Sequence, residues 1–219
     1  MAPTDPVQTI KPHILKQHIT SIRDISKQQL GKGYLTESRI EKAIQTGNTH
    51  YLLVALEEED EITIYKTPQS IEEVGFAKNI PPESNIIGFC LYGVYSDGAL
   101  DEYIHVNREE YPEKLKQSMK TGIIRTVAVH PSHTGNGIGS EMVTNAIDLL
   151  SDMDEIDEMC IVGWKSEDGC HIESVLEDTA FNPEIEYEKY WTQSSLREGY
   201  TCSFCGAPPC MCNAVVFLT

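Results

Sequence analysis

The segment from Val127 to Gly139, VAVHPSHTGNGIG, restricts the fold more than any other part of this chain. It predicts a buried strand that stops at Pro131, then a glycine-rich turn and then a helix. The first N–H groups of a helix have no intrahelical partner, and the helix dipole adds positive potential there. A phosphate could approach this backbone without meeting a Cβ at Gly135, Gly137 and Gly139. The segment therefore predicts a diphosphate site; the alternative is an ordinary strand-to-helix turn.

The glycine spacing excludes two common phosphate motifs, since it contains neither the Gly-Lys-Ser/Thr of a nucleotide P-loop nor G-x-G-x-x-G. It resembles instead the acetyl-CoA motif of the GNAT acetyltransferase superfamily, Arg/Gln-x-x-Gly-x-Gly/Ala after a strand that ends in Val-x-Pro. The matching residues are Thr134, Gly137 and Gly139, preceded by Val129, His130 and Pro131. The match departs from the family at Thr134, where Arg or Gln is usual.

Strands and helices alternate along the chain, which predicts an α/β protein with mixed strand directions. The resemblance extends over about residues 85–181. It implies a GNAT-like, mostly antiparallel central sheet with helices on both faces and a splay between two central strands. We expect this domain to span residues 1–199, with an acidic insertion (a hairpin or loop) at 57–84. Residues 200–219 are expected to form a Cys-rich metal knuckle that ends in a strand.

Local patterns predict further elements. Apolar periodicity predicts one amphipathic helix over residues 14–30 and another over 138–150. Thr36 is a predicted N-cap for a short helix. A last helix is expected over 171–179, followed by a strand over 187–191.

The family resemblance implies that acetyl-CoA lies in the splay as co-substrate. Main-chain groups of Val127 and Val129 would hold its pantetheine arm, and an N–H near Val127 would polarise the thioester carbonyl. The implied reaction transfers an acetyl group to a primary amine by direct attack, after a base removes a proton. The alternative is a non-catalytic acyl-CoA sensor, or a partner-docking module that uses the Cys-rich segment. The predicted cofactor-binding residues are Val127, Val129, Thr134, Gly135, Asn136, Gly137, Ile138 and Gly139.

The catalytic residues are not assigned by the sequence. The family often places a Tyr five residues before the Phe of a Gly-Phe pair, and Leu176 stands at that position here, with Ala180 in place of the Gly. Tyr187 and Tyr190 are candidate substitutes, although core packing is the plainer explanation for both. Glu173 is a candidate base, for which helix capping is the plainer explanation. The other base candidates are Glu102 and His130.

Arg125 lies next to Thr126 on the strand that carries the predicted cofactor contacts. The sequence allows two roles for its guanidinium. It would either face the acceptor pocket or pair with a surface carboxylate, and an exposed pair of that kind contributes little stability.

The chain has 34 acidic and 17 basic residues, for a formal net charge of −17. A surface of this sign repels nucleic-acid phosphates, so we expect no nucleic-acid partner. The acidic surface favours solubility, and adaptation to a salty cytoplasm (a halophilic source) is a second explanation. With no secretory signal and no run of about 18 apolar residues, a cytoplasmic protein without membrane contact is expected. The family resemblance also allows a homodimer.

Four of the seven cysteines crowd the last twenty residues. Their number and their Cys-x-x-Cys-Gly start match a tetrahedral Zn²⁺ site. The alternative is a group of reduced or redox-active thiols, and the spacing fits no common iron–sulfur run. The predicted zinc ligands are Cys202, Cys205, Cys210 and Cys212.

Overall fold

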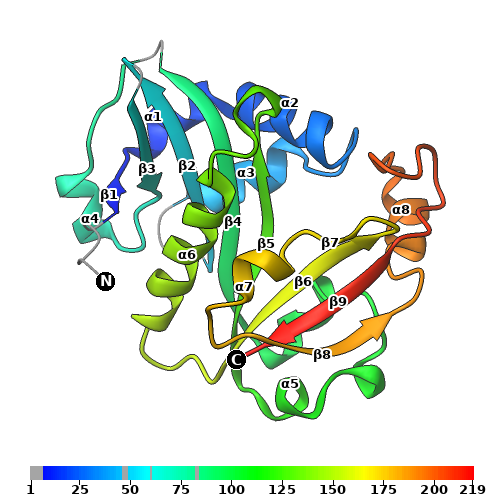
Figure 1. Cartoon of the computed structure of the whole chain (residues 1–219). Helices are drawn as coiled ribbons and strands as arrows, with labels where there is room; N and C mark the ends of the chain where they lie inside the picture. The colour runs from blue at the N-terminus through cyan, green and yellow to red at the C-terminus, as the bar shows by residue number, and fades with distance from the viewer. Residues whose placement is uncertain (1–6, 46–48, 60, 82–83) are drawn as a thin grey trace.

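A computed structural model describes residues 7–45, 49–59, 61–81 and 84–219. Within these ranges the strands form one sheet in the order β1-β3-β2-β4-β5-β6-β9-β8, with β7 paired to β6 (Figure 1). Most neighbouring strands are antiparallel, and the parallel pairs are β1/β3 and β5/β6. The strands are β1 Gln8–Thr9, β2 His50–Glu58, β3 Glu61–Lys66, β4 Asn85–Ser96, β5 Lys120–Val129, β6 Glu158–Ser166, β7 Gly169–Cys170, β8 Asn182–Tyr187 and β9 Asn213–Leu218.

The helices are mostly short. No helix in the described ranges is both long and apolar enough to cross a membrane. The α-helices are α1 Pro12–Gln17, α2 Ile19–Gln29, α3 Glu37–Ile44, α4 Ile71–Phe76, α5 Glu113–Gln117, α6 Ile138–Ser151, α7 Glu173–Leu176 and α8 Thr192–Glu198. The 3₁₀ helices are η1 Asp97–Glu102, η2 Arg108–Glu110 and η3 Pro131–His133.

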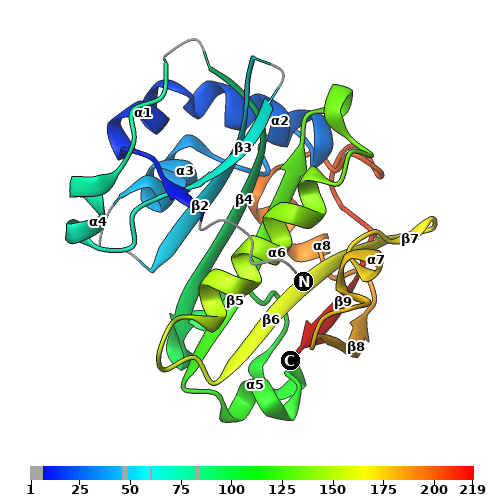
Figure 2. The same cartoon turned by 60° about the vertical axis from the view of Figure 1, so that its left-hand side comes forward.

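Helices cover both faces of the sheet, with α1 to α3 on one face and α6 on the other (Figure 2). The central strand β4 shows why the sheet needs both layers. Its side chains alternate, so that Phe89 and Leu91 lie in the core with α1 to α3, while Cys90 and Tyr92 lie in the core with α6. The predicted fold class, an α/β protein with a mostly antiparallel central sheet and helices on both faces, is confirmed.

Helix α6 follows the predicted apolar repeat. Ile138, Met142, Ala146 and Leu150, spaced four residues apart, are all buried against the sheet. This packing fixes the start of α6 directly after the glycine-rich segment.

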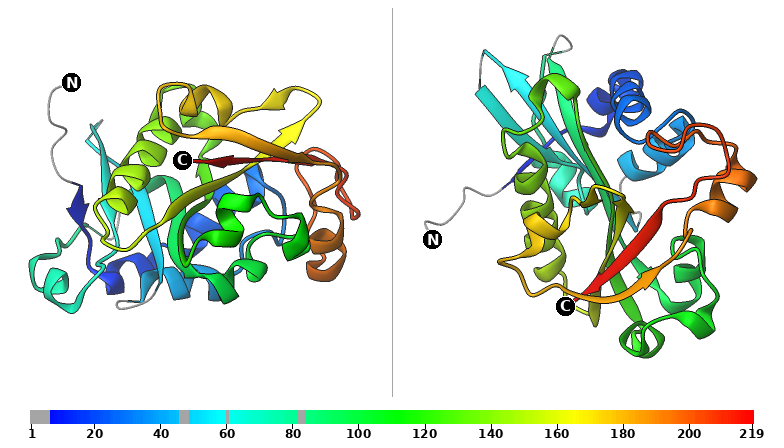
Figure 3. Two further views of the ribbon diagram at one scale, coloured as in Figure 1. Left: turned by 90° about the horizontal axis from the view of Figure 1, so that it is seen from below. Right: turned by 45° about the vertical axis from the view of Figure 1, so that its right-hand side comes forward.

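The splay lies between β5 and β6. These strands pair in parallel only from Thr121 to Ile124, opposite Glu158 to Ile161. Beyond that point β5 stays with β4, while β6 continues along β9 and leans away (Figure 3, right). The side chains of β5 change at the same place, from buried at residues 121–124 to partly exposed at 125–127.

Three local predictions were wrong in extent. The helix predicted over residues 14–30 is two helices, because the His18 N–H bonds the Leu15 carbonyl at 3.0 Å and closes a tight turn between them. The last helix is a single turn, Glu173–Leu176. The strand predicted over 187–191 ends at Tyr187, since the chain then turns through Lys189 with a φ of 51°. The Thr36 N-cap is confirmed, as its side chain accepts from the N–H of Arg39.

The acidic segment at residues 57–84 contributes a strand to the main sheet. β2 and β3 form an antiparallel hairpin that turns near Glu59, so the acidic run lies at a hairpin tip. α4 follows and bonds back to the N-terminal strand through Lys78, whose N–H donates to the Thr9 carbonyl.

The C-terminal strand is also part of this sheet, since β9 lies between β6 and β8. The chain between β8 and β9 forms α8 and the Cys-rich loop, which lie beside the end of α2 (Figure 1). The Thr201 N–H donates to the Lys32 carbonyl at 2.9 Å, and the Ser203 N–H donates to the Leu30 carbonyl at 3.3 Å. The first and last quarters of the chain therefore meet beside the splay.

Candidate active site

The turn between β5 and α6, residues 130–137 (the glycine turn), is exposed and lacks a side-chain cap. Gly137 is the N-cap of α6 with a φ of 79°, and Gly135 has a φ of 82°. Both angles are left-handed, which favours glycine. A Cβ at either glycine would meet no atom within 4 Å, so the space beside these two residues is open. An uncapped helix start facing open space is a site for an anion.

A chain of side chains braces this turn. His130 Nδ1 lies 2.7 Å from the Ser132 hydroxyl, which lies 2.8 Å from His133 Nδ1. His133 Nε2 in turn lies 3.1 Å from the Glu57 carboxylate, and this hydrogen bond lowers the pKa of Glu57. The base candidate His130 is thus tied into the turn. The β2–β3 hairpin, which carries Glu57, is linked to the turn in the same way.

Three of the predicted cofactor contacts have internal partners. The Thr134 hydroxyl donates to the Pro131 carbonyl at 3.0 Å, which commits its proton to the turn and away from a phosphate. The Val129 carbonyl accepts from Gln29 Nε2 at 2.8 Å. The Asn136 amide donates to the His133 carbonyl at 3.3 Å. The backbone N–H groups at the start of α6 are the remaining anion donors.

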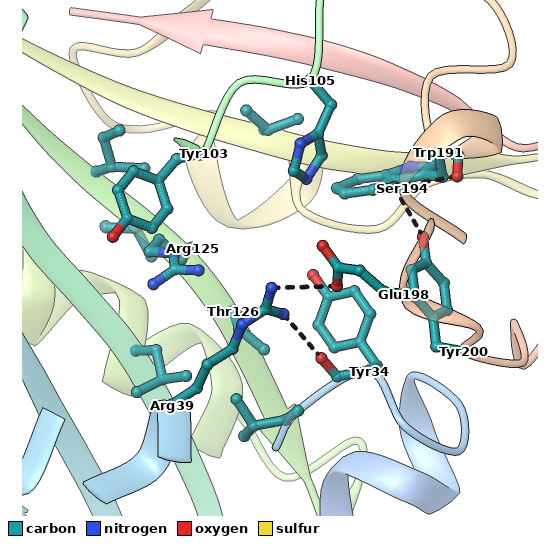
Figure 4. A pocket seen from close by; sticks show the side chains of 15 residues that line it. Tyr34, Arg39, Tyr103, His105, Arg125, Thr126, Trp191, Ser194, Glu198 and Tyr200 are labelled. Carbon is teal, nitrogen blue, oxygen red and sulfur yellow. Dashed lines mark hydrogen bonds and ion pairs between the residues drawn. The ribbon is translucent and has the colours of Figure 1, made fainter. Parts of the chain in front are cut away.

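A pocket opens at the splay between α3 and α8 (the α3–α8 pocket), and Figure 4 shows its polar side chains converging from both ends of the chain. It is lined by Tyr34, Leu35, Arg39, Leu91, Tyr103, His105, Ile123, Ile124, Arg125, Thr126, Val162, Trp191, Ser194, Glu198 and Tyr200. Because Ile124 is the last β5 residue paired with β6, the floor of the pocket is the place where the two strands separate.

The pocket contains charges of both signs. Arg39 bonds the Glu198 carboxylate and the Tyr34 carbonyl, each at 3.1 Å (Figure 4). Arg125 lies with its guanidinium carbon 4.1 Å from the centre of the Tyr103 ring. Burial lowers the pKa of His105 to about 4, so this imidazole is neutral at physiological pH.

The comparisons with known proteins agree with this geometry. The model of the acetyltransferase (GNAT) family matches residues 20–163. The chain belongs to the GNAT family.

Solved structures share the fold. An Arabidopsis thaliana NAA60 structure in complex with acetyl-CoA matches with a TM-score of 0.57 and 10% identity, over 97% of this chain and 96% of that one. NAA60 in complex with a bisubstrate analogue matches with a TM-score of 0.55 and 12% identity, over 96% and 95%. The comparison with curated protein sequences gives no match.

The tyrosines named as substitutes for the usual GNAT tyrosine are placed in the core. The Tyr187 hydroxyl donates to the Glu110 carbonyl at 2.5 Å, and the Tyr190 hydroxyl accepts from the His105 N–H at 2.9 Å. Both rings are buried, and neither lines the pocket. Glu173 is exposed at the start of α7, away from the pocket lining. The side chain of Glu102 lies outside the described residues.

Sequence reasoning missed several polar residues of this pocket, among them Tyr34, His105 and Glu198. They come from the α2–α3 loop, the loop after η1 and the end of α8. None belongs to a motif, so only tertiary contacts bring them together. Arg125, for which the sequence left two roles open, faces the pocket and lacks an ion-pair partner among the described residues.

The four C-terminal cysteines (the Cys cluster) converge on one point. All four sulfur atoms lie within 4.8 Å of one another, and three pairs are 3.4 to 4.0 Å apart. A tetrahedron with Zn–S bonds of about 2.3 Å has sulfur atoms about 3.8 Å apart. The N–H groups of Phe204 and Cys205 each donate to the Cys202 sulfur at 3.3 Å. The Cys cluster fits a tetrahedral Zn²⁺ in ligand type, number and spacing.

Proposed function

We propose that this protein is an N-acetyltransferase that moves an acetyl group from acetyl-CoA to a primary amine by direct attack. One observation carries the proposal: the uncapped glycine turn stands at the end of β5, and the same strand leads to a splay that opens onto the α3–α8 pocket. A diphosphate site and an acceptor pocket are thus connected along one strand.

The cofactor would bind in two parts. Amides from Gly135 to Gly139 would hold the diphosphate, where open space and the helix dipole favour an anion. The pantetheine arm would follow the part of β5 that β6 leaves. An N–H near Val127 would then stabilise the oxyanion that forms on the thioester carbon.

The reaction needs a neutral amine and a protonated leaving group. The amine nitrogen attacks the thioester carbon, the C–S bond breaks, and the amine proton passes to a base. We propose Glu198 and the neutral His105 as the groups that receive the amine and its proton, directly or through water. The CoA thiolate requires a proton, which Leu176, at the position of the usual family tyrosine, cannot donate. Tyr34 is our candidate donor, since burial raises the pKa of its hydroxyl and a hydrogen bond ties it to Thr126.

The Cys cluster would bind Zn²⁺ as a structural ion. It is linked to α8, because the Cys210 N–H donates to the Ser195 hydroxyl at 2.9 Å and the Cys210 carbonyl accepts from Thr192 at 2.7 Å. It is also linked to the α2–α3 loop by Thr201 and Ser203. Both segments line the pocket, so the ion would hold two of its walls in place.

The direct test is isothermal titration of the purified full chain with acetyl-CoA, followed by mass spectrometry of products with a panel of amines. The proposal expects a saturable heat and acetylated product that increases with enzyme concentration. If acetyl-CoA binds but no amine in the panel is acetylated, the protein is better explained as an acyl-CoA sensor. The replacement of the usual tyrosine by Leu176 also argues for a sensor. If millimolar acetyl-CoA gives neither a heat of binding nor a shift in melting temperature, both the acetyltransferase and the acyl-CoA sensor are excluded.

A further inference from the structure

We propose that the acceptor amine carries a carboxylate close to its amino group, and that Arg125 binds this carboxylate in the α3–α8 pocket. This inference rests on the proposed acetyl transfer and specifies the class of its substrate. Free amino acids and peptides that begin with an acidic residue share the required chemistry.

The first argument is the missing partner of Arg125. Of the five arginines, all within the described residues, the other four form an ion pair with Asp or Glu, and Arg125 does not. The protein has 34 acidic residues, so an arginine without a carboxylate is unusual here. This guanidinium lies over the Tyr103 ring (Figure 4) and interacts with the Tyr95 hydroxyl, and neither contact neutralises its charge.

The second argument is the local charge. Arg39 is balanced by Glu198, and His105 is neutral, so Arg125 leaves the pocket with one uncompensated positive charge. The protein as a whole has a formal charge of −17. A positive pocket in a negative protein selects anions locally, because a partly buried charge is screened less than a surface charge.

The third argument is how the backbone directs this side chain. The β4–β5 register shifts so that Leu91 faces Thr126 and Tyr92 faces Ile124, which makes Arg125 the extra residue of a β-bulge. A bulge interrupts the alternation of side chains. Arg125 and Thr126 consequently both line the pocket, whereas Val127 packs on the α6 side.

These positions define the geometry of the acceptor. Arg125 is the first β5 residue beyond the pairing with β6, and Thr126 follows it toward the glycine turn, where it would be next to the thioester. An amine at the thioester would therefore have its carboxylate only a few bonds away. A guanidinium binds a carboxylate through two parallel hydrogen bonds, which also fixes its orientation.

The experiment compares matched acceptors that differ only in the carboxylate. One arm uses glycine and glutamate against their α-amides, and the other uses C-terminally amidated peptides that begin with Asp or Asn. Initial rates are measured at saturating acetyl-CoA and low salt. In at least one arm, we expect kcat/KM for the acceptor with the carboxylate to be at least 10-fold higher than for its matched amide. The arm that shows this preference tells whether the acceptor is a free amino acid or a peptide with an acidic first residue.

Two variants connect the preference to Arg125. Arg125→Gln should raise KM at least 10-fold for the carboxylate acceptor and leave the amide unchanged, and Arg125→Lys should retain part of the preference. The control is Arg23→Gln, which removes the surface pair with Glu37 outside the pocket. Acetyl-CoA affinity should be the same in all three variants, which reports that each is folded.

The outcomes separate the two proposals. Equal kcat/KM for carboxylate and amide acceptors, or a preference that survives in Arg125→Gln, would overturn this inference and leave acetyl transfer intact. If no amine is acetylated although acetyl-CoA binds, both the transfer and the acceptor class are wrong.

Discussion

The guanidinium of Arg39 lies 3.1 Å from the carboxylate of Glu198 and joins α3 to α8 across the α3–α8 pocket, over 159 residues of sequence. Both side chains are partly exposed, and pairs of this kind contribute about 0–1 kcal/mol to folding. The pair therefore matters for the pocket more than for the fold. It neutralises one of the two pocket arginines and orients the carboxylate proposed to receive the amine.

Glu198→Gln should impair acceptor use without unfolding the protein. We expect kcat/KM for the amine to fall at least 10-fold, because the carboxylate that receives the amine is lost, while the melting temperature changes little. Steady-state kinetics and thermal unfolding measure the two effects. Glu37→Gln, which breaks the exposed pair with Arg23, is the matched control and should leave both unchanged. Normal kinetics in Glu198→Gln would exclude Glu198 from proton transfer.

Gly137→Val should weaken acetyl-CoA binding at least 10-fold in titration calorimetry. The left-handed φ of 79° costs an L-residue about 1–2 kcal/mol, and the added side chain would enter the open space beside this residue. Gly75→Ala, in α4 and with no atom within 4 Å of the new Cβ, is the control and should bind normally. Unchanged affinity in Gly137→Val would place the diphosphate elsewhere.

Thr134→Arg should tighten acetyl-CoA binding several-fold, since it restores the residue usual in the family at an exposed position of the glycine turn. The guanidinium would add a charged donor for a phosphate oxygen. Thr134→Val, which removes only the bond to the Pro131 carbonyl, separates the new charge from the lost hydroxyl. Weaker binding by the arginine variant than by the valine variant would mean that the motif is misaligned.

Removal of zinc should weaken the use of the acceptor amine and leave the binding of acetyl-CoA intact. The protein should carry one equivalent of zinc by elemental analysis, and Cys205→Ser should lose it. We expect a lower melting temperature and a raised acceptor KM, because α8 and the α2–α3 loop lose their common anchor. Acetyl-CoA affinity should persist. The control is the Cys170→Ser variant, which changes a cysteine outside the Cys cluster and should still contain one equivalent of zinc. If the native protein contains no metal, the alternative of redox-active thiols is favoured.

Acid should destabilise the protein in part through His105. Its folded pKa, about 4, lies below the ordinary value of 6.5, so the unfolded chain binds the proton more readily. The associated stability is complete above pH 6.5 and is lost as the pH falls toward 4, on the order of 3 kcal/mol in all. His105→Gln should therefore show a smaller drop in melting temperature between pH 7 and pH 4.5 than the native protein. If the melting temperatures of His105→Gln and the native protein fall in parallel with pH, His105 is not a buried neutral imidazole.

The features that the sequence predicted well are local. The residues from Val127 to Gly139 are contiguous, and their strand, glycines and helix start each follow from nearest-neighbour geometry. The N-terminal helices were harder to predict, because neither a glycine nor a proline marks the tight turn at His18 that separates them. The strand predicted after Tyr187 was wrong because the chain turns through Lys189 with a positive φ, which a lysine does not signal in the sequence.

By itself, the amino-acid sequence determined the glycine turn, the family it resembles and the grouping of four thiols within eleven residues, since each of these is written in adjacent positions. Only the tertiary structure decided the α3–α8 pocket. Tyr34, His105 and Glu198 meet through the packing of separate segments. The direction of Arg125 depends on a bulge set by the pairing of β5 with β4, and strand register is a property of two distant segments together.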